Sequence, residues 1–85
     1  MKIDKKCWPK SFEAILKGEK SFDVRIADFD CEPGDVLHFR EWDPKKQEYT
    51  GRSIEKQVKH VMKTKNQQYW NQDDIDLYGF QVLGF

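Results

Sequence analysis

Three charged residues that follow a glycine in close succession are the strongest candidates for chemistry in this chain. Lys20, Asp23 and Arg25 lie in the polar segment that begins at Gly18. The lysine offers a point charge and the arginine a planar fork, and both suit a phosphate or the edge of a base. On a strand, Asp23 and Arg25 share one face, where the carboxylate can hold the guanidinium or accept a hydrogen bond from a base amine. These residue types suit a nucleotide-like ligand, although a surface ion pair with no ligand is the more common use of such residues.

Three residues further along the chain are candidates to extend this site. They are Arg40, Tyr49 and Arg52. The two arginines suit a phosphate, and the tyrosine ring suits stacking on a base. Alternatively, Tyr49 and Arg52 only shape the connection of a hairpin. Both interpretations stay open, and all three residues are included among the predicted ligand-binding residues.

The spacing of the reactive side chains indicates neither a metal site nor a catalytic site. The soft metal ligands are Cys7, Cys31, His38 and His60, which do not form the closely spaced pairs of zinc sites. We therefore predict no metal site and no cofactor. No acid and base pair is identifiable, so we assign no catalytic residue.

A short helix is the first element expected to position the candidate site. Pro9 suits a first helical position, Phe12 and Ile15 fall on one face, and Gly18 supplies the left-handed residue that ends the helix. Trp8 stands four residues before Phe12, where an aromatic side chain commonly packs against the helix start. We therefore expect Trp8 in the core, although a partly exposed ring would suit base stacking.

Alternating apolar and polar residues predict strands after this helix. The expected strands cover residues 21–26, 36–42, 53–62 and 79–85, and a turn at residues 32–35 precedes the second. Leu37 and Phe39 are expected to face the core. Residues 64–76 leave three possibilities open: an ordered helix, a loop over the cleft, or a flexible segment.

The length of the chain limits the fold to one domain. A chain of 85 residues builds one hydrophobic core, so residues 1–85 form a single domain, and its 14% aromatic content supplies large apolar side chains for that core. One helix followed by several strands predicts an α+β, β-rich fold, a small barrel with the N-terminal helix packed at its side.

Charge is balanced overall but uneven along the chain. Residues 1–25 carry seven Lys and Arg against four Asp and Glu, and residues 52–65 carry five against one. If these two segments meet, a positive face forms despite zero net charge. With no long apolar run and no apolar segment behind the N-terminal charges, we expect a cytoplasmic monomer without membrane contact and with reduced cysteines.

The order and spacing of several motifs resemble those of ASCH domains, which share a β-barrel fold with PUA RNA-binding domains. Residues 18–25, GEKSFDVR, resemble the G-x-K-x-x-E-x-R signature, with Asp23 in place of the usual Glu. Residues 33–37, PGDVL, resemble the turn and strand that follow, and the segments CWP, REWDP and YTGR look like a short, functionally uncharacterised branch. The resemblance implies a PUA-like barrel whose cleft, lined by the signature residues, binds RNA or a nucleotide. Without it, the same residues would make an ordinary surface ion pair.

Two other functions compete with this binding module. Some ASCH relatives look like amidohydrolases of acylated nucleosides, which implies a hydrolase acting on a modified nucleoside or RNA in the same cleft. Asp23 occupies the position of the nucleophilic hydroxyl in that pattern, and the carboxylate expected near the end of the last strand is missing. We therefore favour a binding protein over an enzyme. The third possibility is a protein-interaction module that has kept the fold and lost the ligand.

Overall fold

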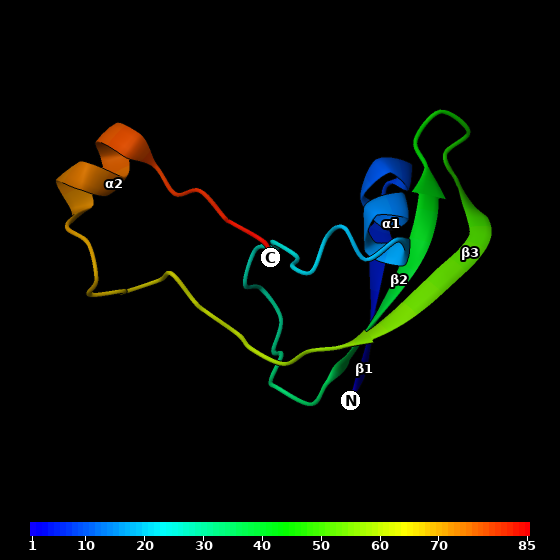
Figure 1. Cartoon of the computed structure of the whole chain (residues 1–85), viewed down its shortest axis with the longest axis horizontal. Coiled ribbons are helices and arrows are strands. Elements are labelled where there is room, and N and C mark those ends of the chain that lie inside the picture. The colour runs from blue at the N-terminus through cyan, green and yellow to red at the C-terminus, as the bar shows by residue number, and fades with distance from the viewer.

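One open, three-stranded sheet carries a helix on one of its faces. The computed structural model describes residues 1–85, in the order β1 (Lys2–Cys7), α1 (Pro9–Leu16), β2 (Val36–Asp43), β3 (Glu48–Gln57) and α2 (Gln72–Tyr78) (Figure 1). Strand β2 is central, parallel to β1 and antiparallel to β3. The α+β class is therefore confirmed, whereas the expected barrel is corrected: β1 and β3 are free edges, and the sheet does not close on itself.

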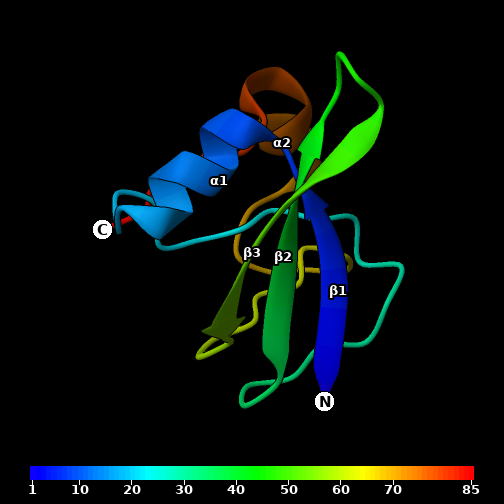
Figure 2. The ribbon, with the colours of Figure 1, turned by 90° about the vertical axis from the view of Figure 1, so that its right-hand side faces the viewer.

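Helix α1 forms where its sequence signals predict it. Pro9 occupies the first turn, and Gly18, with a φ of 78°, lies in the left-handed region just beyond the helix. Phe12 and Ile15 are buried on one face of α1, and their cluster includes Cys7 of β1 and Phe39 of β2. This small core joins the helix to the sheet. Figure 2 shows α1 lying beside the strands.

Strand alternation divides the side chains of the sheet between two faces. Phe39 pairs with Ile54 across β2 and β3, and both contribute to the core under α1. Two residues beyond Phe39, Glu41 pairs with Cys7 of β1 and is only 4% exposed. The period of two therefore places a carboxylate on the apolar face of the sheet.

Two predicted strands are wrong. Residues 21–26 and 79–85 run without strand pairing, and Val24 and Ile26 are 64% and 82% exposed. The alternation of residues 21–26 indicates an extended backbone. A strand also needs a neighbouring strand whose backbone N–H and C=O groups can form hydrogen bonds with it. The hydroxyl of Ser21 donates a hydrogen bond of 2.7 Å to the backbone carbonyl of Phe85, which joins the two segments.

Two further expectations need correction. The third strand covers Glu48–Gln57, so it starts and ends five residues earlier than predicted. Trp8 is 61% exposed and not in the core, since it is the residue that precedes the first turn of α1 and it lines a pocket there. Its exposure matches the alternative, a ring open to a ligand.

After β3 the chain forms an extended arm, residues 58–85, that includes α2 (Figure 1). Helix α2 begins at Gln72, where the side chain of Asn71 accepts a hydrogen bond of 2.9 Å from the backbone N–H of Asp74. The open question about residues 64–76 is thereby answered in part, since the last five are helical. Neither helix of the protein is long and apolar enough to cross a bilayer.

Candidate functional site

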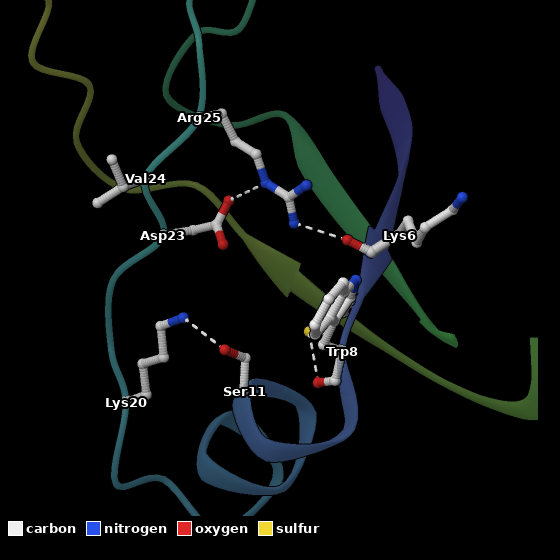
Figure 3. A pocket seen from close by; sticks show the side chains of 8 residues that line it. Lys6, Trp8, Ser11, Lys20, Asp23, Val24 and Arg25 are labelled. Carbon is white, nitrogen blue, oxygen red and sulfur yellow. Dashed lines mark hydrogen bonds and ion pairs between the residues drawn. The ribbon is translucent and has the colours of Figure 1, made fainter. Parts of the chain in front are cut away.

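A polar pocket of about 320 Å³ lies where β1 ends, α1 begins and the segment after α1 returns past them (Figure 3). Lys20, Asp23 and Arg25 line it from the returning segment. The structure thus brings together the three residues that the motif predicts. The other wall comes from the end of β1 and the first turn of α1, including Lys6 and Ser11.

Lys20 points across the pocket toward the start of α1. Its ammonium nitrogen donates a hydrogen bond of 3.3 Å to the hydroxyl of Ser11. The ion pairs of the protein do not include Lys20, so no carboxylate neutralises its charge. A half-buried, unpaired ammonium group is available to an anionic ligand.

Asp23 and Arg25 form an ion pair at the opposite side of the pocket. Arg25 donates from Nε to the Asp23 carboxylate at 2.8 Å and from Nη2 to the carbonyl of Lys6 at 2.9 Å. The second bond ties the returning segment to β1. A guanidinium group has five N–H donors, so Arg25 keeps donors for a ligand while these two bonds fix its plane.

Trp8 and the helix start complete the rim of the pocket. The Trp8 side chain supplies no capping hydrogen bond and Pro9 has no N–H, so the backbone N–H groups of the first turn that lack a side-chain cap are those of Lys10 and Ser11. These groups carry partial positive charge and add to the field of Lys20 and Arg25. The exposed indole lies beside them and offers an aromatic face.

Cys7 contributes to the pocket as a neutral thiol. It is 3% exposed, and burial raises the pKa of its thiol. Since the thiolate is the nucleophilic form, Cys7 is poorly suited to attack a ligand.

Arg52 lies outside this pocket and binds the buried carboxylate of Glu41. The hydroxyl of Thr50 also donates to Glu41, at 2.7 Å, and Arg52 reaches Glu13 on α1 as well. The hydrogen bond from Arg52 holds the pKa of Glu41 below its usual range. Sequence reasoning missed Glu41, although its place in the alternation with Leu37 and Phe39 was a signal that a charged side chain would need a partner there.

Arg40 and Tyr49 meet on the other face of the sheet. The Arg40 guanidinium lies 3.9 Å from the ring centre of Tyr49, and that ring packs edge-on against Trp42 at 5.0 Å. The ammonium of Lys6 lies 3.8 Å from the ring centre of Trp42. The six predicted residues therefore divide into three in the pocket, two in this cation–aromatic cluster and one in the Glu41 network.

The fold and the pocket define a small α+β domain with a cationic, aromatic-rimmed recess at the start of its first helix. A family model described as Domain of unknown function (DUF3850) matches residues 4–84, and the chain belongs to this family. No curated protein and no solved structure matches the chain. No group of three or more His, Cys, Asp or Glu side chains is arranged to hold a metal ion.

Proposed function

We propose that this protein is a binding module for RNA or a nucleotide, and that it holds one nucleotide unit in the pocket lined by Lys20, Asp23 and Arg25. The observation that carries the proposal is the convergence of these three residues in one recess. A volume of about 320 Å³ is at the lower end of the range for small-molecule sites, which suits one nucleotide unit better than a folded macromolecular surface.

Each wall of the pocket supplies one part of nucleotide recognition. Lys20, Arg25 and the uncapped start of α1 attract a phosphate. Trp8 offers its exposed face to the base, and Asp23 accepts from a base amine. Phosphate contacts position a nucleic acid, whereas the contacts of Asp23 and Trp8 with the base provide selectivity.

Relationship to the ASCH and PUA-like domains is part of the same proposal. Its support is the motif at residues 18–25 and the position of the pocket beside the helix that precedes it. The C-terminal residues also return to this segment: Gly84 packs so closely on the ring of Phe22 that no side chain would fit.

The test is an NMR titration of the labelled protein with short single-stranded RNAs, hairpin RNAs and a panel of nucleotides. We expect salt-sensitive shifts of the amides around Lys20, Asp23 and Arg25. Lys20→Ala and Arg25→Ala should each weaken binding at least about tenfold, the loss expected for one charged contact. Lys46→Ala, in the exposed turn between β2 and β3, removes the same charge elsewhere and serves as the matched control.

Full affinity in both pocket variants would remove the site from consideration. An absence of shifts with every RNA and nucleotide would favour the alternative, a domain that binds a protein partner. Folding of each variant is checked by the dispersion of its amide spectrum, so that a loss of binding is not confused with unfolding.

A hydrolase acting on a modified nucleoside is the second candidate, and one contact bears on it. Ser11 places a hydroxyl 3.3 Å from the Lys20 amine, so the pocket contains a hydroxyl even though Asp23 stands at the nucleophile position of the motif. In this contact Lys20 donates to the hydroxyl, which fits a charged lysine that binds anions better than a neutral one that activates a nucleophile. Hydrolysis of an acylated nucleoside that Ser11→Ala abolishes would favour the enzyme.

A further inference from the structure

The arm exposes more apolar surface than the rest of the protein. Nine of the sixteen large apolar side chains that are exposed belong to residues 58–85. Several are at the outer end of the arm: Leu77 and Tyr78 on α2 are 71% and 78% exposed. Helix α2 has no buried residue at all. Contiguous apolar surface of this kind marks an interaction site.

Local contacts nevertheless order the outer part of the arm. Trp70 packs edge-on against Phe80 at 5.6 Å, and Asn71 caps α2 between them. The main packing between elements joins α1 and the three strands and leaves α2 outside (Figures 1 and 2). Helix α2 is therefore a formed element that packs on neither α1 nor the sheet, whereas the end of the arm touches Ser21 and Phe22 of its own chain.

The total surface area shows how much contact is missing. A compact monomer of 10.2 kDa has an accessible surface of about 5,300 Å² by the usual scaling with mass, whereas this chain exposes 7223 Å². Its radius of gyration is 14.8 Å, against about 12 Å for a compact domain of this length. About 1,900 Å² is thus exposed beyond what a compact fold of this mass requires.

We propose that the outer part of the arm, residues 66–80, packs against residues 52–65 of a second copy of the chain, which are the C-terminal half of β3 and the segment after it, and that the reciprocal contact completes a two-fold dimer. If each copy hides this excess, the interface buries about 3,800 Å² in total, within the range of permanent homodimers. Strand β3 is a sheet edge with nine of its ten residues exposed, so its backbone is open to a neighbour.

Charge complementarity supports a second copy as the partner. Residues 66–85 contain three Asp and no Lys or Arg, whereas residues 52–65 contain five basic residues and one acidic residue, and three of the basic residues follow β3. Each copy therefore carries both halves of a complementary contact, as a two-fold interface requires. The sequence alone favours a monomer, whereas the surface area of the folded chain favours this dimer. The proposal is independent of the ligand of the pocket.

Sedimentation equilibrium of the full chain tests the proposal, together with Leu77→Asp and Tyr78→Asp. We expect the wild-type protein to have twice the mass of 10.2 kDa at micromolar concentration. Each variant should raise the dissociation constant at least about 30-fold, as the loss of an interface hot spot does. Both side chains are exposed, so the variant monomers should stay folded, and their amide spectra verify this.

Lys46→Asp introduces the same side chain in the turn between β2 and β3, outside the proposed contact, and should leave the dimer intact. In a mixture of labelled and unlabelled protein, cross-copy NOEs should connect Leu77 and Tyr78 to residues 52–65. A wild-type protein that stays at 10.2 kDa with a radius of gyration near 12 Å would overturn the proposal and show that the arm packs on its own chain. A dimer with unchanged affinity in both variants, or cross-copy NOEs to another surface, would overturn it equally.

Discussion

Arg52 binds the buried carboxylate of Glu41 through two hydrogen bonds, from Nε and from Nη2, each 2.9 Å long. Glu41 belongs to β2 and Arg52 to β3, and Arg52 also pairs with Glu13 of α1. One guanidinium group therefore connects the helix to two strands of the sheet. Geometry of this kind, with both carboxylate oxygens bound, is the strong form of an ion pair.

This pair predicts how stability depends on pH. The pKa of Glu41 is lower in the folded protein than in the unfolded chain, because Arg52 donates to its carboxylate. Its stabilising contribution is therefore fully present above the unfolded pKa and is lost as the pH falls through the folded pKa. The free energy of unfolding from urea titrations should fall as the pH drops below 4.5, the ordinary pKa of a glutamate, and Glu41→Gln should be less stable at pH 7 and show a shallower fall. Parallel pH profiles for the two proteins would contradict this role.

Three other carboxylates also make the folded protein less stable at low pH, because folding lowers their pKa values. They are Asp4, Asp35 and Glu55. A hydrogen bond with His38 lowers the pKa of Asp4, the backbone N–H of Glu32 lowers that of Asp35, and Lys2 lowers that of Glu55. These carboxylates are at the surface, so each contributes little and salt screens it. The Glu41→Gln variant should therefore retain part of the acid-induced loss, and added salt should reduce that remainder.

Phe12 should be the most costly side chain of the core to remove. It is 1% exposed, and only Cys7, Ile15 and Phe39 are buried with it as apolar residues. Phe12→Ala should lower the free energy of unfolding by about 3–5 kcal/mol, since it removes a buried ring and leaves a cavity. Leu16→Ala, on the same helix but 48% exposed, is the matched control and should cost less than half as much. Equal losses in urea unfolding would show that the core is not centred on Phe12.

Trp8 should matter for binding and little for folding. Its ring is 61% exposed at the rim of the pocket, so Trp8→Ala should leave the melting temperature nearly unchanged. Loss of base stacking should weaken the affinity for single-stranded RNA by about 1–3 kcal/mol, and Trp8→Phe should restore most of it. Calorimetric titration of the three proteins measures this. Wild-type affinity in Trp8→Ala would argue against a stacked base.

Lys20 should contribute to the salt dependence of RNA binding. Each phosphate contact with a single strand adds about 0.7 to the slope of log K against log salt concentration. Lys20→Ala should make that slope shallower by about 0.7, whereas Trp8→Ala should leave it unchanged. An unchanged slope in Lys20→Ala would mean that Lys20 contacts the base or no ligand at all.

Local signals in the sequence were sufficient for α1 and β2. Pro9 and Gly18 bound the helix, and the turn at residues 32–35 precedes a strand in which Phe39 faces the core as expected. Both elements are specified by residues close together in the chain. The grouping of Lys20, Asp23 and Arg25 in one pocket follows in the same way, from a short segment beside the helix that precedes it.

Structural features that depend on residues far apart in the chain could not be predicted from the sequence. An extended run such as residues 21–26 pairs only if a matching backbone edge lies next to it, and no local pattern reports that edge. The role of Arg52 depends on Glu41, eleven positions earlier, which is buried because of the register between β1 and β2. The place of Trp8 depends on how the chain enters α1, where the residue lines the pocket and stays 61% exposed.

Every side chain that lines the pocket comes from residues 6–25, one continuous stretch of the chain. Closing so short a loop costs little entropy compared with pairing β1 to β2 across more than thirty intervening residues. The recess can therefore take shape early in folding, before the sheet is complete. Substitutions of the side chains that line the recess can likewise change its shape and charge, while the Glu41–Arg52 pair of the sheet stays as it is.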